Sequence, residues 1–428
     1  MAETLLAGTL LVATLGLVLA RPWGLGRAWW AALGGAATVA SGLVTPGQAA
    51  GLLSETADPL VLLVGLMALS AVAEKAGFFG WSASVAVRAG GGSTARLFAM
   101  VFAVGCATTA VLSLDATAVV LTPIVLGAVS RLGLKPLPFA FACVYAANTA
   151  SLFLPVSNLT NLLAYNAFGL GFGRYALVML LPAALAVAAN VSVFLWLFRR
   201  DLRGRYDAAA APPFVPQDPA FFRAATGALL AVLAAFFFAP LLGVPIGAVA
   251  LAAAVLVGAV ARLKGWMGPR EVASSVSWDV LVLVLGLFLV VRGAQGAGLG
   301  ALAEGAYSAV GAGDGFLRIL AVASGAALGS NALGNLPATL LALDAMGPLV
   351  SGGQLGRTAV YATIVGTGVG PNLTVVGSLA TLIWLSVARG KGVKVTAKDF
   401  LKVGLIATPP ILVAACAGLW LSLRVFGA

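Results

Sequence analysis

The sequence predicts an all-α polytopic membrane protein built from two inverted five-helix repeats, each with a re-entrant hairpin and a broken transmembrane helix. Three observations predict this fold. The 428 residues are 61% hydrophobic and only 9% charged, whereas a soluble domain carries roughly 25% charged residues. Apolar stretches of about 17 to 25 residues, long enough to cross the hydrocarbon core of a bilayer, recur from end to end. Finally, residues of the first half recur in the second half at a nearly constant spacing.

Ten apolar segments are each expected to cross the membrane once. They are residues 4–20, 28–44, 58–75, 138–168, 175–198, 220–239, 246–262, 278–293, 357–388 and 401–424. Two further stretches, 97–130 and 316–350, are long but are interrupted near their middles by polar residues. Half of such a stretch gives roughly 24 Å of helix, which is short for a full crossing. We interpret both as re-entrant hairpins, with two short spans in each as the alternative.

The distribution of basic residues predicts the orientation of these segments. Ten crossings place both termini on one side of the membrane and the linker 199–223 on the other. Of the 25 Lys and Arg residues, twenty fall on the linker side. The five on the terminal side are Arg174, Arg292, Arg318, Arg357 and Arg424. Because cytoplasmic loops carry the excess of Lys and Arg, we expect the linker inside the cell and both termini outside.

The beginning of the chain predicts a retained first helix. Met1-Ala2-Glu3 precedes the first apolar run and the first basic residues follow it, whereas a cleavable signal peptide has its positive charge first. The expected organisation is a first transmembrane repeat at 1–198, a cytoplasmic linker at 199–223 and a second, inverted repeat at 224–428. The expected location is the cytoplasmic (inner) membrane.

Two sets of matching residues support the repeats. Asp58, Gly65, Ala76 and Gly77 recur 221 residues later as Asp279, Gly286, Ala297 and Gly298. At an offset of 220, Asp115 matches Asn335, and 156–159 matches 376–379. Each half has five crossings, an odd number, so the second copy must be inserted upside down. This is the inverted-repeat plan of many secondary transporters.

Composition argues against several other functions. The chain has no histidine, and Cys106, Cys143 and Cys416 lie far apart in apolar segments. Metal sites and nucleophile pairs of the usual kinds are therefore not expected, and neither are catalytic residues or a cofactor. No G-x-x-x-x-G-K-[ST] phosphate-binding loop is present. The net charge of +11 is interpreted as a topology signal, and no nucleic-acid partner is expected.

Polar residues interrupt the apolar pattern at four places, which the architecture brings to the middle of the membrane. Pro155 and the cluster Gly368, Gly370 and Pro371 break two spans, and the freed backbone groups need partners. Helix N-termini at such breaks present N–H donors, and Asn, Ser and Thr add neutral donors and acceptors. The candidate substrate-binding residues are Ser113, Thr117, Asn148, Ser157, Asn158, Thr160, Asn161, Asn331, Asn335, Gly370, Asn372, Thr374 and Ser378. The alternative is that these side chains only cap broken helices.

Asp115 is the candidate proton-coupling residue. It lies at the tip of the first predicted hairpin, whereas nearly all other acidic residues fall in loops or near the ends of spans. A carboxylate within the membrane is costly and is a functional candidate by default. The alternative is a structural cap of the following helix. Asp344 is the second candidate, and it is expected nearer the outer surface.

The motifs at these places resemble the arsenite/antimonite efflux permeases of the ion transporter superfamily. The resemblance rests on the runs 115–123, 148–161 and 370–385, of which the last is the most specific, and it covers essentially the whole chain. It implies export of trivalent arsenic or antimony hydroxides driven by inward proton flow, sometimes with a separate ATPase subunit. The chain departs from these permeases at Leu114 and Gly334, where they have Asn, and at Asn372, where they have Lys.

The leading hypothesis is therefore a proton-coupled antiporter for As(OH)₃ or Sb(OH)₃, with the small inorganic solute, protons and the lipid bilayer as its partners. The candidate site offers Asn, Ser and Thr but no Lys or Arg, which suits a neutral trihydroxide. A sodium/proton antiporter is one alternative, although a lone core carboxylate argues against it. A dicarboxylate carrier is another, because residues 157–160 resemble its Ser-Asn-Thr signatures. A membrane enzyme is the least favoured class.

Overall fold

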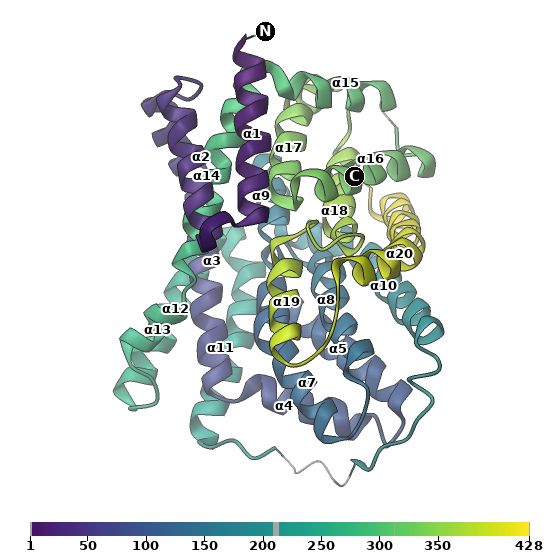
Figure 1. Ribbon diagram of the computed structural model, residues 1–428. Helices are drawn as coiled ribbons and strands as arrows, with labels where there is room; N and C mark the ends of the chain where they lie inside the picture. The colour runs from purple at the N-terminus through teal and green to yellow at the C-terminus, as the bar shows by residue number, and fades with distance from the viewer. Residues whose placement is uncertain (1, 209–213, 312, 428) are drawn as a thin grey trace.

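A computed structural model describes residues 2–208, 214–311 and 313–427. Residues 209–213 of the predicted linker therefore lie outside the described part. The described residues form helices and no strand (Figure 1). The α-helices are α1 (Ala2–Ala20), α2 (Arg27–Ala40), α3 (Pro46–Lys75), α4 (Phe78–Ala89), α5 (Thr94–Val111), α6 (Leu114–Ala116), α7 (Thr122–Arg131), α8 (Pro136–Ala150), α9 (Leu159–Ala167), α10 (Phe172–Leu197), α11 (Pro219–Phe238), α12 (Ile246–Leu263), α13 (Pro269–Ser275), α14 (Trp278–Ala294), α15 (Gly300–Val310), α16 (Phe316–Leu333), α17 (Asn335–Ser351), α18 (Arg357–Val369), α19 (Leu379–Gly390) and α20 (Ala397–Phe426).

Short 3-10 or π-helical turns connect several of these helices. They are η1 (Pro22–Gly24), η2 (Thr117–Leu121), η3 (Ser151–Phe153), η4 (Pro155–Ser157), η6 (Ala239–Leu242), η7 (Gln295–Leu299) and η8 (Gly370–Asn372). Among the described residues, 11 helices are long and apolar enough to cross a membrane. All ten predicted spans coincide with helices or with broken helices of the structure. The chain is thus an all-α polytopic membrane protein.

Some boundaries differ from the prediction. Helix α3 begins at Pro46 rather than near residue 58, because Thr45 and Gln48 form a reciprocal capping box at its start. The short helices α4, α13 and α15 were not among the predicted segments. They are too short to cross a bilayer, so a search for spanning lengths passes over them.

The two interrupted stretches are hairpins, as predicted. Helix α5 turns at residues 112–113 and the chain returns through α6, η2 and α7, whereas α16 turns at Gly334 and returns through α17. Figure 1 shows α4, which precedes the first hairpin, at the bottom of the molecule, and α15, which precedes the second, at the top beside the N-terminus. These two ends are called the α4 end and the α15 end below. The hairpins therefore start from opposite ends.

Local geometry repeats between the two halves. Gly77 joins α3 to α4 with φ 88°, and its repeat partner Gly298 precedes α15 with φ 90°. Both positions need the left-handed backbone conformation that glycine adopts without strain. Gly65 of α3 packs directly on Ala250 of α12, and its repeat partner Gly286 of α14 packs on Ala31 of α2. The sequence offset therefore corresponds to equivalent places in the two halves.

The three most extensive helix pairs join the two halves. Helix α14 packs along α2, α3 packs along α12, and α10 packs along α20. In addition, the return arm of each hairpin packs against the second half of the other repeat's broken helix: η2 and α7 against α19, and α17 against α9. This exchange brings the hairpins and the broken helices together at the interface between the repeats.

The described parts of the predicted linker are attached to the helices around them. The backbone N–H of Tyr206 donates to Gly92 (3.0 Å), and its hydroxyl donates to the carbonyl of Val87 (2.5 Å). Asp201 pairs with Lys135 (2.5 Å). These contacts hold the start of the linker against α4 and the loop after it, and against the loop between α7 and α8.

At the other end of the linker, Asp218 caps α11. One of its oxygens accepts the N–H groups of Phe221 (3.0 Å) and Ala220 (2.8 Å), and the other accepts the indole N–H of Trp266 (2.6 Å). These bonds, that from Phe221 most of all, lower the pKa of Asp218. The carboxylate form is thus the one that the cap favours.

Two exposed ion pairs join α3 to the second half. Lys75, the last residue of α3, pairs with Glu271 of α13 (2.6 Å). Glu55, twenty residues earlier on α3, pairs with Arg292 of α14 (2.9 Å). Such pairs contribute little to stability, on the order of 0–1 kcal/mol each. They show which parts of the two halves face each other.

Candidate functional site

The first break lies between α8 and α9 and is held by amide side chains. The backbone turns through η3 and η4 around Pro155, which cannot donate to a helical ladder. Asn158 caps α9 by accepting from the N–H of Thr160 (3.2 Å), and its amide donates to Ser151 (3.4 Å). Asn161 donates to the backbone carbonyl of Ser151 (2.6 Å). Predicted site residues therefore form this break, with their side chains directed at it.

The second break lies between α18 and α19 and is tied to the tip of the second hairpin. Asn331 donates to the carbonyl of Gly370 (2.8 Å) and accepts from the hydroxyl of Thr374 (2.7 Å). The N–H of Asn335 donates to the carbonyl of Gly377 (2.9 Å). These bonds satisfy backbone groups that the break leaves without a helical partner.

Ser378 begins the other half of the second broken helix. Its hydroxyl accepts from the N–H of Thr381 (3.1 Å), which caps α19. The N-termini of α9 and α19 thus both start at the breaks. Each presents the positive end of a helix dipole there.

A buried polar network connects the two broken helices across the repeats. Asn148 of α8 donates to the side chains of Asn372 (3.0 Å) and Thr381 (3.1 Å), and its carbonyl oxygen accepts from Ser378 (3.3 Å). Asn372 in turn donates to the hydroxyl of Thr149 (3.2 Å). All five side chains are buried. The network contains no charged group, and it fixes the two breaks relative to each other.

The amides of Asn148 and Asn372 use their donors and acceptors inside the protein. Tyr145 adds to this arrangement by donating to the backbone carbonyl of Asn372 (2.7 Å). Removing one member would leave buried polar partners unpaired, at about 1–3 kcal/mol for each group. In this structure, the two asparagines therefore hold the two repeats together through hydrogen bonds.

Other buried polar atoms at the first break are unpartnered within the described residues. They are the hydroxyl of Thr160, the side-chain carbonyl of Asn161 and that of Asn190. Asn190 lies on α10 and donates to Thr149 (2.8 Å). Buried polar groups normally have a hydrogen-bond partner. These three oxygens are thus candidates for contact with a polar solute.

The three predicted residues of the first hairpin have different roles. Ser113 caps α6 by accepting from the N–H of Ala116 (3.2 Å). Thr117 is fully buried and its hydroxyl contacts that of Thr109 (2.8 Å) on the opposite arm, so it holds the hairpin together. The side chain of Asp115 is partly exposed and has no hydrogen bond or ion pair with any described residue.

One hydrogen bond ties the first hairpin to the break of its own repeat. The hydroxyl of Ser157 donates to the carbonyl of Ala110 (3.2 Å), near the end of α5. In the second repeat, the backbone bond from Asn335 to Gly377 is the corresponding tie. The structure thus connects thirteen of the predicted residues to the breaks or hairpins, and leaves Asp115 unpaired.

Several residues bonded to the site were not among its predicted residues: Thr149, Ser151, Asn190, Thr381 and Tyr145. Thr149 and Ser151 nevertheless lie in the polar run 148–161. Two of the others had a signal. Asn190 is the one amide in the apolar run 175–198, and Thr381 follows Ser378 at the spacing of an N-terminal cap. Tyr145 gave no such signal, because an aromatic residue in an apolar segment is usually a packing residue.

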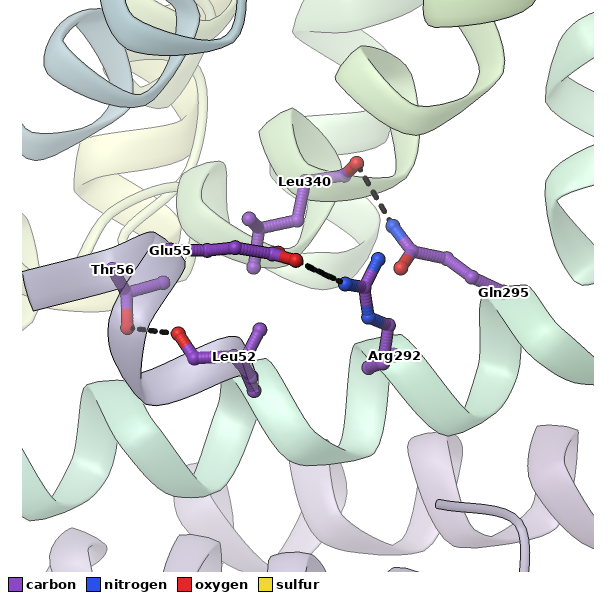
Figure 2. Close-up of polar contacts among 6 residues, drawn as sticks. All are labelled: Leu52, Glu55, Thr56, Arg292, Gln295 and Leu340. Carbon is purple, nitrogen blue, oxygen red and sulfur yellow. Dashed lines mark hydrogen bonds and ion pairs between the residues drawn. The ribbon is translucent and has the colours of Figure 1, made fainter. Parts of the chain in front are cut away.

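A cavity of about 830 Å³ lies at the α15 end, away from the polar network. Helices α3, α9, α14, α15 and α17 line it. None of the thirteen predicted substrate-binding residues lines it, whereas Asp344, the second candidate for proton coupling, does. Figure 2 shows the polar contacts at its wall, where Arg292 binds both oxygens of Glu55 (3.0 and 2.9 Å) and Gln295 donates to the carbonyl of Leu340 (3.1 Å). The walls of the cavity therefore carry charged groups, unlike the neutral polar motifs at the two breaks.

Comparison with solved structures supports the fold. The Alcanivorax borkumensis YdaH transporter is similar with a TM-score of 0.61 and 17% identity, covering 99% of this chain and 98% of that one. Neisseria gonorrhoeae MtrF is similar with a TM-score of 0.52 and 13% identity, covering 88% of this chain and 84% of that one. At these identities the likeness concerns the fold alone.

Proteins with higher sequence identity to this chain include named transporters. Arsenical pump membrane proteins of Escherichia coli (strain K12) and Yersinia enterocolitica are each 33% identical to this chain, covering 98% of it and 99% of the relative. An uncharacterized transporter of Mycobacterium tuberculosis is 28% identical over 85% of this chain and 86% of its own. The family model described as "ArsB: Arsenical pump membrane protein" matches residues 6–423. The chain therefore belongs to the arsenical pump membrane protein family.

Proposed function

We propose that this protein exports arsenite and antimonite, as the neutral trihydroxides As(OH)₃ and Sb(OH)₃, in exchange for protons. The observation that carries the proposal is the buried, uncharged polar network joining the two broken helices. Family membership supports a membrane transporter for arsenicals. The choice of a neutral solute follows from the chemistry of the network.

A neutral trihydroxide needs hydrogen-bond donors and acceptors but no opposite charge. The unpartnered oxygens of Thr160, Asn161 and Asn190 are such groups, and the helix N-termini at Asn158 and Ser378 add N–H donors. Burying an ion there would cost several kcal/mol unless it were paired. A neutral solute avoids this cost.

Coupling to protons is assigned to Asp115. Its unpaired side chain lies one residue after the start of α6, at the turn of the first hairpin. A carboxyl group without a fixed cation can bind and release a proton in each cycle. In the proposed cycle, solute and proton occupy the empty carrier alternately, so proton flow into the cell drives the solute out. This exchange needs no ATP, although an ATPase subunit could add to it.

We further propose that the protein lies in the cytoplasmic membrane with the α4 end inside, and with both termini and the α15 end outside. The division into repeats at 1–198 and 224–428, joined by the cytoplasmic linker 199–223, belongs to this proposal. The basic residues of α4, of the linker and of the loops beside them support it.

Single cysteines test the orientation. In a variant without the three native cysteines, Arg203→Cys should react with a membrane-impermeant thiol reagent only from the cytoplasmic side, and Val425→Cys only from outside. Both positions are exposed. Labelling is compared between intact cells and everted vesicles. Reaction of both residues from the same side would contradict an odd number of crossings per repeat.

Uptake into everted vesicles tests the substrate. With an imposed pH gradient, acid inside, and without ATP, we expect accumulation of arsenite that collapses when the gradient is dissipated. Sodium and succinate, measured in the same vesicles, represent the sodium/proton antiporter and the dicarboxylate carrier. Vesicles without the protein are the control. Gradient-driven uptake of sodium or succinate in place of arsenite would contradict the proposal.

A further inference from the structure

The cavity at the α15 end lies over the helices that carry the candidate site. Two of the helices that line the cavity start at the candidate site: α9 is capped by Asn158, and α17 begins at Asn335. The lining residues Leu163 and Leu340 lie four and five residues beyond these helix starts. At a rise of 1.5 Å per residue, they are only about 6–8 Å along their helices from the site. The cavity is thus separated from the site by roughly one to two helical turns.

Charged groups reach the cavity from four of its five helices. They are Glu55 of α3, Arg292 of α14, Glu304 of α15 and Asp344 of α17, whereas α9 contributes the neutral amide of Asn166. Arg292 is paired with Glu55 (Figure 2). Glu304 and Asp344 form no ion pair with any described residue. One cation therefore faces three carboxylates.

A second carboxylate, that of Asp344, lines the same two cavities as Arg292. Arg292 and Asp344 together line both the large cavity and a smaller one of about 300 Å³, which also includes Gln295. Gln295, less than one turn beyond Arg292, already bonds to α17 at Leu340. The end of α14 thus contacts α3 on one side and α17 on the other.

We propose that the cavity is the outer vestibule of the transport path and that Arg292 is a switch between two carboxylates that sets its width. Pairing with Glu55 holds the side chain at α3, away from Asp344, and leaves the vestibule open, as seen here. Pairing with Asp344 would draw α17 toward α14 and narrow the vestibule. This inference rests on the transport function proposed above.

The size of the effect follows from the exposure of the pair. The side chains of Arg292 and Glu55 are 36% and 60% exposed, and exposed pairs shift an equilibrium by at most about fivefold. A modest bias suits a switch, because a carrier must populate both of its states during each cycle.

Reactivity of a cysteine at Leu340 measures how open the vestibule is. Leu340 is half-buried and is the lining residue of α17 nearest to Asn335. The Leu340→Cys protein, without its native cysteines and in native membranes, is treated from outside with a membrane-impermeant thiol reagent. We expect Asp344→Asn to raise the labelling rate by about two- to fivefold and Glu55→Gln to lower it by a similar factor.

The two substitutions remove the same charge from the same cavity. An altered local potential acting on the reagent would therefore change both rates in the same direction, whereas a switch changes them in opposite directions. Glu271→Gln, which breaks the comparable exposed pair at the other end of α3, is the matched control and should leave the rate unchanged.

Equal or parallel effects of Asp344→Asn and Glu55→Gln would overturn the inference, and so would an equal effect of Glu271→Gln. The labelling needs no substrate, so it is independent of the identity of the solute. If arsenite uptake fails while the opposite labelling effects appear, the proposed substrate is wrong and the switch remains. If uptake succeeds and the opposite effects are absent, the switch is wrong.

Discussion

Replacing Asp115 with asparagine is expected to abolish export against a gradient while leaving exchange of the solute intact. Asparagine keeps the size and hydrogen bonding of aspartate but cannot ionise. Because the side chain of Asp115 has no hydrogen bond or ion pair with a described residue, the substitution leaves no partner unpaired. We therefore expect a normal amount of folded protein, with the loss confined to coupling.

Two measurements in everted vesicles separate coupling from binding. Gradient-driven accumulation of arsenite should fall to the level of vesicles without the protein, whereas counterflow exchange without a gradient should continue. Asp279→Asn, which alters an exposed carboxylate in the first turn of α14, is the matched control. If Asp115 only caps the following helix, asparagine should replace it almost fully. Undiminished accumulation would therefore exclude Asp115 as the coupling residue.

Asn158→Ala and Asn335→Ala should each remove the protection that the protein gives a sensitive host against arsenite. Asn158 lies at the first break and Asn335 at the second hairpin, and their side chains differ in their partners. Asn158 caps α9 and contacts Ser151, so its loss also costs about 0.5–2 kcal/mol of stability. The side chain of Asn335 has no hydrogen bond with a described residue. Its loss should therefore affect binding alone.

The amount of protein in the membrane, its thermal stability in detergent and the intracellular arsenite concentration are measured for both variants. Asn335→Ala should show wild-type stability and high intracellular arsenite. Gln354→Ala, which removes an exposed amide between α17 and α18, should behave as the wild type does. Full protection by both asparagine variants at normal protein levels would mean that the two residues are only structural.

The spans and hairpins could be predicted because the bilayer imposes a length on apolar segments. The same rule explains the error at α3. Its first twelve residues include Gln48, Glu55 and Thr56, which suggested a loop. In the structure, Glu55 and Thr56 line the cavity at the α15 end. A polar helical turn that faces an aqueous cavity cannot be distinguished from a loop by hydropathy alone.

The polar residues of the site could be predicted, but their pairing could not. Asn148 and Asn372 are 224 residues apart, and no local pattern indicates that their amides meet. The same holds for Glu55 and Arg292, which are 237 residues apart. Contacts between repeats depend on how whole helices pack, which a single sequence does not contain. Asp58 is another example. The sequence identifies it as a residue repeated in the second half, but does not indicate that its carboxylate caps α12 by accepting from the N–H of Gly247 (2.7 Å).

The ion pairs at Glu55 and Lys75 also mark the thickness of the bilayer that suits this protein. Twenty residues of helix separate them on α3, a rise of about 30 Å, which equals the depth of a typical hydrocarbon core. In a membrane of that depth both pairs lie at the water boundary. A thicker bilayer would pull one pair into hydrocarbon, where its charges lose their hydration, and a thinner one would leave apolar helix exposed to water. The spacing of the two pairs on α3 thus matches the hydrocarbon core of an ordinary bilayer.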